Sequence, residues 1–409
     1  MVITSCICVV AALLWDYVVR TGHRWLLFLG TLLLAVLSAA GLYHYEDLFP
    51  GLIASGWEGL YDGKAMAGLI WLLACLLAFP CLVVVAIARF FCRPRRRRRG
   101  RRRQRRSSGV TRRSFLKGLA ALIPVAAFAT SGAGNLLGER DLDTTYHVLK
   151  YKNLPDYLDG YKIGQLSDLH MGLFFSTRRL QEALDAVAAQ GVNRLEITGD
   201  LIDELALLPK AQAILKANAI LKANASRFPD GIDFCYGNHE YYRSFDAITA
   251  MLDDTPVRVL RNSAFQASRG CGQGLRGCNG RDGRSFYIAA TDYSFAKGDE
   301  AFAKEREQYV RETLTKVPED AFVVMLAHHS AFIDEGFAHH IPLTLCGHTH
   351  GAQFAPIAPL VTALGFKYLR GMFQKGDCRG YVNRGTGHWL PFRVLCSREA
   401  SVFELRKQA

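Results

Sequence analysis

Five short segments in the C-terminal half of this chain each carry side chains that bind metal ions. Their carboxylates, imidazoles and single carboxamide suit two neighbouring divalent cations such as Mn, Fe or Zn, and the lack of thiolates among them disfavours copper and iron–sulfur centres. The pattern therefore predicts a metal-dependent hydrolase. The segments are Asp168-Leu169-His170, Gly199-Asp200-Leu201-Ile202-Asp203, Gly237-Asn238-His239-Glu240, Ala327-His328-His329 and Gly347-His348-Thr349-His350.

Each of these segments begins where an apolar run typical of a β-strand ends. The predicted strands are Lys162–Ser167, Arg194–Thr198, Ile232–Tyr236, Phe322–Ala327 and Leu343–Cys346. Strands that alternate with helical patterns predict an α/β fold. Because ligands of α/β sheets bind beyond the carboxyl ends of the strands, we expect the five segments to converge on one site.

Two helices are predicted between these strands. The first covers Thr177–Gln190, with Ser176 as its N-cap and Gly191 just beyond its end,. The second covers Pro209–Asn224.

In this order, the motifs D-x-H, G-D-x-x-D, G-N-H-E, H and G-H-T-H resemble those of the calcineurin-like metallophosphoesterase superfamily, over roughly residues 146–409. The closer likeness is to a membrane-associated bacterial branch in which the last motif continues Gly-Gly-Gln, where this chain has Gly351-Ala352-Gln353. The run Tyr-Val-Asn-Arg-Gly-Thr-Gly at 381–387 also resembles that branch. The resemblance implies a four-layer α/β/β/α sandwich of two packed sheets.

The resemblance also implies a role for each motif residue. His239 would protonate the leaving oxygen or contact the phosphate, and the reaction would be hydrolysis of a phosphoester by a metal-activated hydroxide. Asp203 and Glu240 are expected to orient the ligands or cap a helix. Seven residues would hold two divalent metal ions, with Asp200 bridging both, Asp168, His170 and His350 on one ion, and Asn238, His328 and His348 on the other.

Some neighbours of the motifs have two interpretations. His329 is expected to form a pocket wall or to lie at the surface, and the alternative is a contact with substrate. Tyr241, Tyr242 and Phe354 either line a substrate groove or pack in the core.

The first 92 residues are mostly apolar and predict an all-α transmembrane region. Three stretches, Val2–Val19, Trp25–Tyr43 and Ala65–Phe91, are long enough for a bilayer, which takes about 20 helical residues,. Asp16 is expected to reach the interface near Arg20, the alternative being a functional carboxylate inside the membrane,.

The charges between these stretches predict their orientation. The loop after the first stretch is basic and the loop before the third is acidic, whereas thirteen arginines follow within residues 93–113. By the positive-inside rule, the N-terminus lies outside and the arginine tract forms a cytoplasmic linker. The tract also accounts for the whole formal net charge of +13, so nucleic acid is not an expected partner,.

Residues 114–140 follow paired arginines and have two interpretations. Thr111-Arg112-Arg113-Ser114-Phe115-Leu116-Lys117 and the apolar run to Ala133 resemble a twin-arginine export signal, which implies the export machinery as a partner,. The alternative is a fourth membrane anchor. Both interpretations place the catalytic domain, residues 146–409, outside the cytoplasm of a bacterium, as part of a multi-pass inner-membrane protein. Outside the cytoplasm, Cys271 and Cys278 could form a disulfide,.

The resulting hypothesis is a membrane-anchored phosphoesterase that acts on a phosphodiester or lipid-linked phosphate at the outer face. A pyrophosphatase of nucleotide-linked lipid precursors is the alternative enzyme, although such a role usually requires a cytoplasmic substrate. A metal-retaining sensor module without turnover, or a channel or transporter, is the alternative outside the enzymes.

Overall fold

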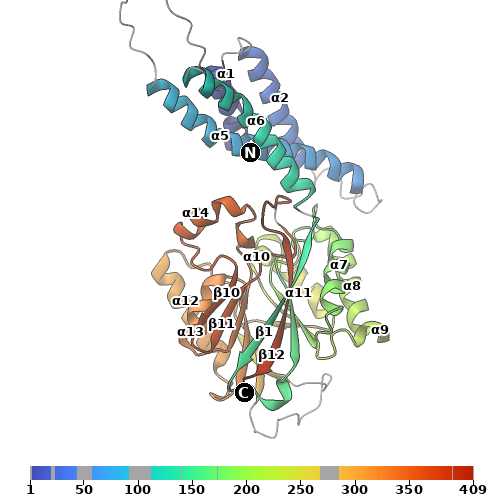
Figure 1. The fold of residues 1–409 in the computed structure, drawn as a ribbon. Coiled ribbons are helices and arrows are strands. Elements are labelled where there is room, and N and C mark those ends of the chain that lie inside the picture. The colour runs from blue at the N-terminus through green and yellow to red at the C-terminus, as the bar shows by residue number, and fades with distance from the viewer. Residues whose placement is uncertain are drawn as a thin grey trace, which may run out of the picture. The chain divides into compact units, whose positions relative to one another are not determined.

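The computed structural model describes residues 2–19, 24–43, 58–91, 112–138, 140–172, 174–267, 285–388 and 390–408. They form two compact units, Met1–Leu137 and Gly138–Ala409 (Figure 1). The arginine tract before Arg112 and the Cys271–Cys278 pair lie outside the described residues.

The first unit is a group of helices whose contacts use small side chains. They are α1 (Val2–Val19), α2 (Arg24–Tyr43), α5 (Glu58–Phe91) and α6 (Arg112–Leu136). Buried positions include many alanines and cysteines, such as Cys8, Ala35 and Ala120, whereas large apolar side chains such as Leu26 and Phe91 face outward. The side chain of Asp16 is buried within this unit.

Helices occur where the three membrane spans were predicted. Among the described residues, Ala67–Phe91, with a mean hydropathy of 2.8, is the one stretch long and apolar enough to cross a bilayer. Apolar stretches of the other helices within the described residues are Cys6–Tyr17, Trp25–Val36 and Ala120–Leu136. One predicted span thus has the length and composition of a membrane helix, and the other two stay predictions.

In its described residues, the second unit contains two six-stranded sheets. The first has the order β1 (Leu142–Tyr151), β12 (Arg398–Lys407), β2 (Tyr161–Leu166), β3 (Arg194–Thr198), β4 (Ile232–Cys235), β5 (Val257–Leu260). The second has the order β10 (Gly371–Lys375), β11 (Cys378–Val382), β9 (Leu343–Cys346), β8 (Phe322–Leu326), β7 (Phe286–Ala290), β6 (Ser263–Ala267). Strands β2 to β5 are parallel, as are β7, β8, β9 and β11.

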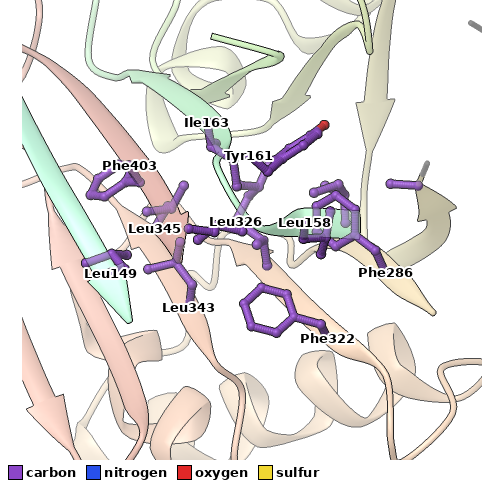
Figure 2. Close-up of a cluster of buried hydrophobic side chains, with 14 of the residues drawn as sticks. Leu149, Leu158, Tyr161, Ile163, Phe286, Phe322, Leu326, Leu343, Leu345 and Phe403 are labelled. Carbon is purple, nitrogen blue, oxygen red and sulfur yellow. The ribbon is translucent and has the colours of Figure 1, made fainter. Parts of the chain in front are cut away.

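The hydrophobic core lies between the two sheets. Figure 2 shows Tyr161, Ile163 and Phe403 of the first sheet packed with Leu326 and Leu345 of the second. These side chains alternate along their strands with residues that face the helices, as expected for a sheet covered on both sides.

Helices cover the outer faces of both sheets. On the first sheet, α7 (Thr177–Ala188) packs on β2 and β12, and α11 (Phe245–Asp253) packs on β5. On the second, α12 (Asp299–Leu314) packs on β6 and β7, and α13 (Ile333–Ala338) packs on β9 and β11. The predicted mixed α/β class is confirmed, and the layers follow the order α/β/β/α (Figure 1).

The predicted strands lie within one residue of the observed ones, but the helices differ more. Ser176 is the N-cap residue of α7, as predicted, but its side chain makes no capping hydrogen bond. The predicted second helix is divided into α8 (Leu208–Ile220) and α9 (Lys222–Ala225), because Leu221 between them has an extended backbone with ψ 130°.

Candidate metal centre

The five predicted segments lie at one edge of the sandwich, beyond the carboxyl ends of β2, β3, β4, β8 and β9. Their ligand atoms form three overlapping groups, in each of which the atoms lie within 4.8 Å of one another. The groups are Asp168, His170 and His350; His170, Asp200 and His239; and Asp200, His328 and His348. The first consists of the three residues that the resemblance assigns to one ion, and the third contains two of the three assigned to the other ion, His328 and His348, together with Asp200.

The imidazoles in these groups point nitrogen atoms at one another and at the carboxylates. His170 Nε2 lies 3.0 Å from His350 Nε2, and His348 Nδ1 lies 3.3 Å from His328 Nε2. Asp200 Oδ2 lies 3.1 Å from His328 Nε2 and 3.5 Å from His170 Nε2, between the two clusters. A carboxylate in that position can bridge two cations.

Asn238 provides the test of whether the donors fit a metal. Its side chain is buried, and its Oδ1 makes no hydrogen bond in the described part of the chain. A buried carbonyl oxygen without a partner costs about 1–3 kcal/mol, so a native structure keeps one only for a reason. A cation bound beside His328 and His348 would supply the missing partner, so the donor set fits a pair of divalent ions.

Five of the seven predicted ligands have left-handed backbone conformations. The φ angles are 52° at Asp168, 46° at His170, 55° at Asp200, 73° at His348 and 49° at His350. Residues other than glycine rarely adopt this region, and such positions cluster at functional sites. The turns after β2, β3 and β9 therefore hold conformations that aim the ligands inward.

Asp203 and Glu240, the two predicted supporting residues, lie within hydrogen-bond distance of the predicted ligands or their backbone. Asp203 Oδ2 lies 3.1 Å from His170 Nδ1, and its Oδ1 lies 2.6 Å from His239 Nδ1. The Glu240 carboxylate accepts backbone N–H bonds from Asp200 (2.9 Å), Leu201 (2.7 Å) and Gly237 (2.7 Å). Asp203 thus orients two imidazoles, while Glu240 caps α10 (Asn238–Arg243) and fixes the Asp200 turn,.

The carboxylates of the site differ in their proton affinity. Burial raises the pKa of Asp168 above its usual value. Burial also opposes ionisation of Asp200, but His328 and His170 hold its pKa well below the usual range. Burial and the neighbouring Asp200 raise the pKa of Glu240 to about 7. Asp200 is therefore the carboxylate best suited to remain charged between two cations.

Aromatic side chains surround the second ligand cluster. The Tyr293 ring lies 5.9 Å from that of His328 and 5.6 Å from that of His348. His329 packs 4.9 Å from Phe302, and burial lowers its pKa to about 3, so it is a neutral wall of the site. Tyr242 is exposed, 5.6 Å from the ring of His239.

The other two aromatic residues with two interpretations pack away from the ligands. Tyr241 is half-buried, stacks on Phe245 and donates to Asp292 Oδ1 over 2.5 Å. Phe354 packs 5.7 Å from Phe392.

The segment 383–387, for which the sequence predicted no role, supports the first ligand cluster. Its backbone donates from Thr386 to the carbonyl of Ser167 over 2.7 Å and from Gly387 to the carbonyl of Asp168 over 3.0 Å. The buried guanidinium of Arg393 holds the segment by donating to the carbonyls of Arg384 and Gly387. The only sign of this role in the sequence was the likeness of residues 381–387 to one branch of the superfamily.

A family model described as calcineurin-like phosphoesterase matches residues 161–352, which contain all seven predicted ligands and His239. Residues 161–352 are thus similar to calcineurin-like phosphoesterases. This calcineurin-like domain is a metal-dependent phosphoester hydrolase with a site for two divalent metal ions.

Relatives of the calcineurin-like domain include proteins from bacteria and animals. An uncharacterized metallophosphoesterase of Bacillus subtilis, YkuE, is 29% identical over 305 residues, which cover 73% of this chain and 98% of that protein. An uncharacterized metallophosphoesterase of Helicobacter pylori is 28% identical over 263 residues. The match covers 63% of this chain and 64% of that protein. A transmembrane protein with metallophosphoesterase domain from Danio rerio is 24% identical over 81% of this chain and 74% of its own.

Solved structures also share similarity with the calcineurin-like domain, at low scores. The NAD nucleotidase NadN of Haemophilus influenzae has a TM-score of 0.32 and 13% identity, over 55% of this chain and 45% of that one. A dimetal phosphatase from Danio rerio has a TM-score of 0.29 and 11% identity, over 56% of this chain and 88% of that one.

Proposed function

We propose that this chain is a membrane-anchored phosphoesterase that hydrolyses a phosphodiester or a lipid-linked phosphate at the outer face of a bacterial inner membrane. The observation that carries the catalytic part is the convergence of six candidate ligands and His239 at one sheet edge, together with the buried Asn238 Oδ1, which has no partner in the described part of the chain. Turnover of an aryl phosphodiester by the full chain, with Mn, Zn, Fe or Mg added separately, tests it.

In this proposal the residues keep the roles implied by their motifs. Asp168, His170 and His350 would hold one ion, Asn238, His328 and His348 would hold the other, and Asp200, which lies between the two clusters, would serve both. A bound pair of divalent cations supplies a water of lowered pKa and stabilises charge on a phosphoryl oxygen. The protein holds the ligands in place through the Asp203 and Glu240 contacts, and Tyr293 and His329 wall the site.

His239 is proposed as the acid that protonates the leaving oxygen. Its Nδ1 lies 2.6 Å from Asp203 Oδ1 and its backbone N–H donates to Asp200 Oδ1 over 2.8 Å, so the ring is oriented beside the bridging carboxylate. Carboxylates orient acid–base imidazoles in this way.

Replacing His239 by Ala should lower kcat by about 10²- to 10⁴-fold, the usual contribution of a general acid. Metal content should stay unchanged, because the proposed ligand sets do not include this imidazole. Aryl phosphodiester kinetics and elemental analysis of the same preparation measure the two effects. His339→Ala is the matched control, because His339 pairs with Glu307 away from the five motifs and should leave both values unchanged. Loss of metal in His239→Ala would make His239 a ligand instead of an acid, since it also lies in one of the ligand groups.

Membrane anchoring is proposed from the first unit. Its helices bury small residues and expose large apolar ones, which is the reverse of a soluble bundle and typical of helices that pack within lipid,. The stretch Ala67–Phe91 is long enough to span a bilayer,. The zebrafish relative is itself named a transmembrane protein.

The outer-face location is proposed from the charged loops and from the twin-arginine-like start of α6. Residues 1–140 fused to alkaline phosphatase, which is active only outside the cytoplasm, should give enzyme activity in bacterial cells. The same residues fused to a fluorescent protein that matures only in the cytoplasm should stay dark. The reverse pair of results would place the site in the cytoplasm and favour the pyrophosphatase of nucleotide-linked lipid precursors.

Lysine replacement of both Arg112 and Arg113 then separates the two interpretations of α6 (Arg112–Leu136). Export by the twin-arginine route should be lost in this variant, whereas a simple anchor with a positive flank should keep its orientation.

A further inference from the structure

One segment beside the metal centre is apolar but contributes nothing to the core. It consists of the short helices η5 (Ala355–Ile357) and α14 (Ala358–Ala363), followed by Leu364. Nine of the ten residues from 355 to 364 are apolar, Thr362 being the exception, and neither helix contains a buried residue. Leu360 is 59% exposed and Leu364 is 74% exposed.

Another large apolar residue, Leu395, extends the surface formed by Ile357, Leu360 and Leu364. Leu395 is 83% exposed and has a φ of 54°, a left-handed conformation that is unfavourable for leucine,. It is held beside the segment because its neighbour Val394 pairs with Phe354 and accepts the N–H of Ala355. We call Ile357, Leu360, Leu364 and Leu395 the apolar rim. Clusters of exposed apolar residues on this scale mark interaction surfaces.

The apolar rim is connected to the metal centre at both ends of its segment. At one end, α14 contacts the turn η4 (His350–Ala352), which carries a predicted ligand. At the other, the Phe366 ring lies 6.2 Å from the rings of both His329 and His348. The rim therefore borders the site.

The chain enters the second unit at the same edge. Leu142 pairs with Arg398 at the start of β12, and β12 runs antiparallel to β2, so β1 begins at the edge where β2 ends and the ligands lie. Helix α6 ends at Leu136. The six steps from Leu136 to Leu142 span at most about 20 Å. The end of α6 is therefore tied by this short stretch of chain to the start of β1, at the edge of the second unit where the ligands lie.

We propose that the apolar rim inserts into the acyl-chain boundary of the bilayer and that the substrate is a phosphoester carried by a membrane lipid. This inference depends on the proposed function, because it assumes a membrane-anchored phosphoesterase. A lipid surface fits better than a protein partner because residues 355–364 carry no charge, whereas protein interfaces surround their apolar centre with a polar rim and hydrogen bonds,. Apolar segments of this kind lie about 5–10 Å deep in the interface.

Photolabelling from the acyl chains tests the docking. The full chain is reconstituted in vesicles of phosphatidylcholine and phosphatidylglycerol that contain a phospholipid with a diazirine in its acyl chain, irradiated, and mapped by mass spectrometry. Residues 355–367 should be labelled in the wild-type protein. The double variant Leu360→Asp/Leu364→Asp should reduce this labelling by about tenfold or more, because charged side chains are expelled from the acyl region.

A matched pair of variants controls for exposed apolar residues in general. Ile220 and Leu221, at the end of α8, are 66% and 56% exposed. Their Asp variants should leave the labelling of 355–367 unchanged. Both double variants should retain the wild-type rate on a water-soluble aryl phosphodiester, which shows that they are folded.

The failures of the two proposals give different results. Labelling of α5 without labelling of 355–367 overturns the rim inference and leaves the anchor, whereas no labelling of either overturns the anchor. Cross-linking of 355–367 to a second copy of the chain, or to its own helical unit, in place of lipid also overturns the rim inference.

Hydrolysis of lipids tests the substrate class. Wild-type protein should hydrolyse phosphatidic acid or phosphatidylglycerol in vesicles with a kcat/KM at least about tenfold above that for glycerol phosphate, and Leu360→Asp/Leu364→Asp should remove this advantage. Equal values, or hydrolysis of neither lipid, overturn a lipid-borne substrate of this class. Absence of aryl phosphodiester turnover in the wild type would instead contradict the proposed function itself.

Discussion

The replacement of Asp200 by Asn should reduce phosphoester turnover by about 10³-fold or more, because bound cations contribute several kcal/mol to the transition state. Asp200 is the carboxylate that lies between the two ligand clusters, 3.1 Å from His328 Nε2 and 3.5 Å from His170 Nε2. Asn keeps the shape and can still accept the N–H of His239, but it removes the negative charge that a bridging ligand supplies. Bound metal, measured by elemental analysis, should fall together with turnover.

The control for this variant is Asp185→Asn. Asp185 is half exposed and pairs with Arg227 on the surface, so its loss should leave metal content and turnover unchanged. Thermal unfolding followed by circular dichroism should show both variants folded. If Asp200→Asn kept wild-type turnover, the catalytic centre would lie elsewhere in the chain.

The second large effect is expected from Gly387→Ala. A methyl group at this position would lie 1.9 Å from the carbonyl oxygen of Leu169 and 2.8 Å from that of Asp168. Both are backbone atoms of the first ligand turn, so the turn must move. The expected result is a loss of about 1–3 kcal/mol in the free energy of unfolding, typical of overpacking, with weaker metal binding. Denaturant unfolding and metal titration measure the two effects.

Gly172→Ala is the matched control for Gly387→Ala. It also lies next to a ligand turn, but an added methyl would meet its nearest neighbours at an ordinary distance of 3.6 Å. Neither glycine requires a left-handed backbone, so the pair isolates the steric effect. Equal stability and equal metal affinity of the two variants would show that the segment 383–387 does not position Asp168.

The strand ends were predictable from the sequence because each buried parallel strand is a short apolar run with a polar motif directly after it. For β3 and β9 the predicted bounds are the observed ones. The rule that ligands gather beyond strand ends then brought Asp168 and His350 together across 182 positions of the chain, and the structure places their side chains 3.4 Å apart,.

The strands β1 and β12 could not be predicted in the same way. They pair residues 142–151 with residues 398–407, and no local signal reports such a distant pairing. In addition, β12 buries Arg398, Glu399 and Glu404, which hide the apolar pattern of a strand. The carboxylate of Glu399 is satisfied by Tyr381, Arg384 and Thr145, contacts that exist only after folding.

The support of the site was also beyond local reasoning. Arg393 is 1% exposed, and within the described part of the chain its guanidinium donates to backbone carbonyls and to the Cys396 thiol. Burial lowers its pKa to about 10. Arginine is rarely buried without a carboxylate, so composition could not have indicated this position.

The left-handed turns of the site have a consequence for how the protein can change over evolutionary time. Asp168, His170, Asp200, His348 and His350 each hold a backbone conformation that glycine adopts at little cost and other residues do not,. Glycine at any of them would relax the backbone while removing a ligand. Selection for thermal stability alone would therefore favour more stable variants that lack activity. Retaining the metal ligands requires selection for catalytic turnover.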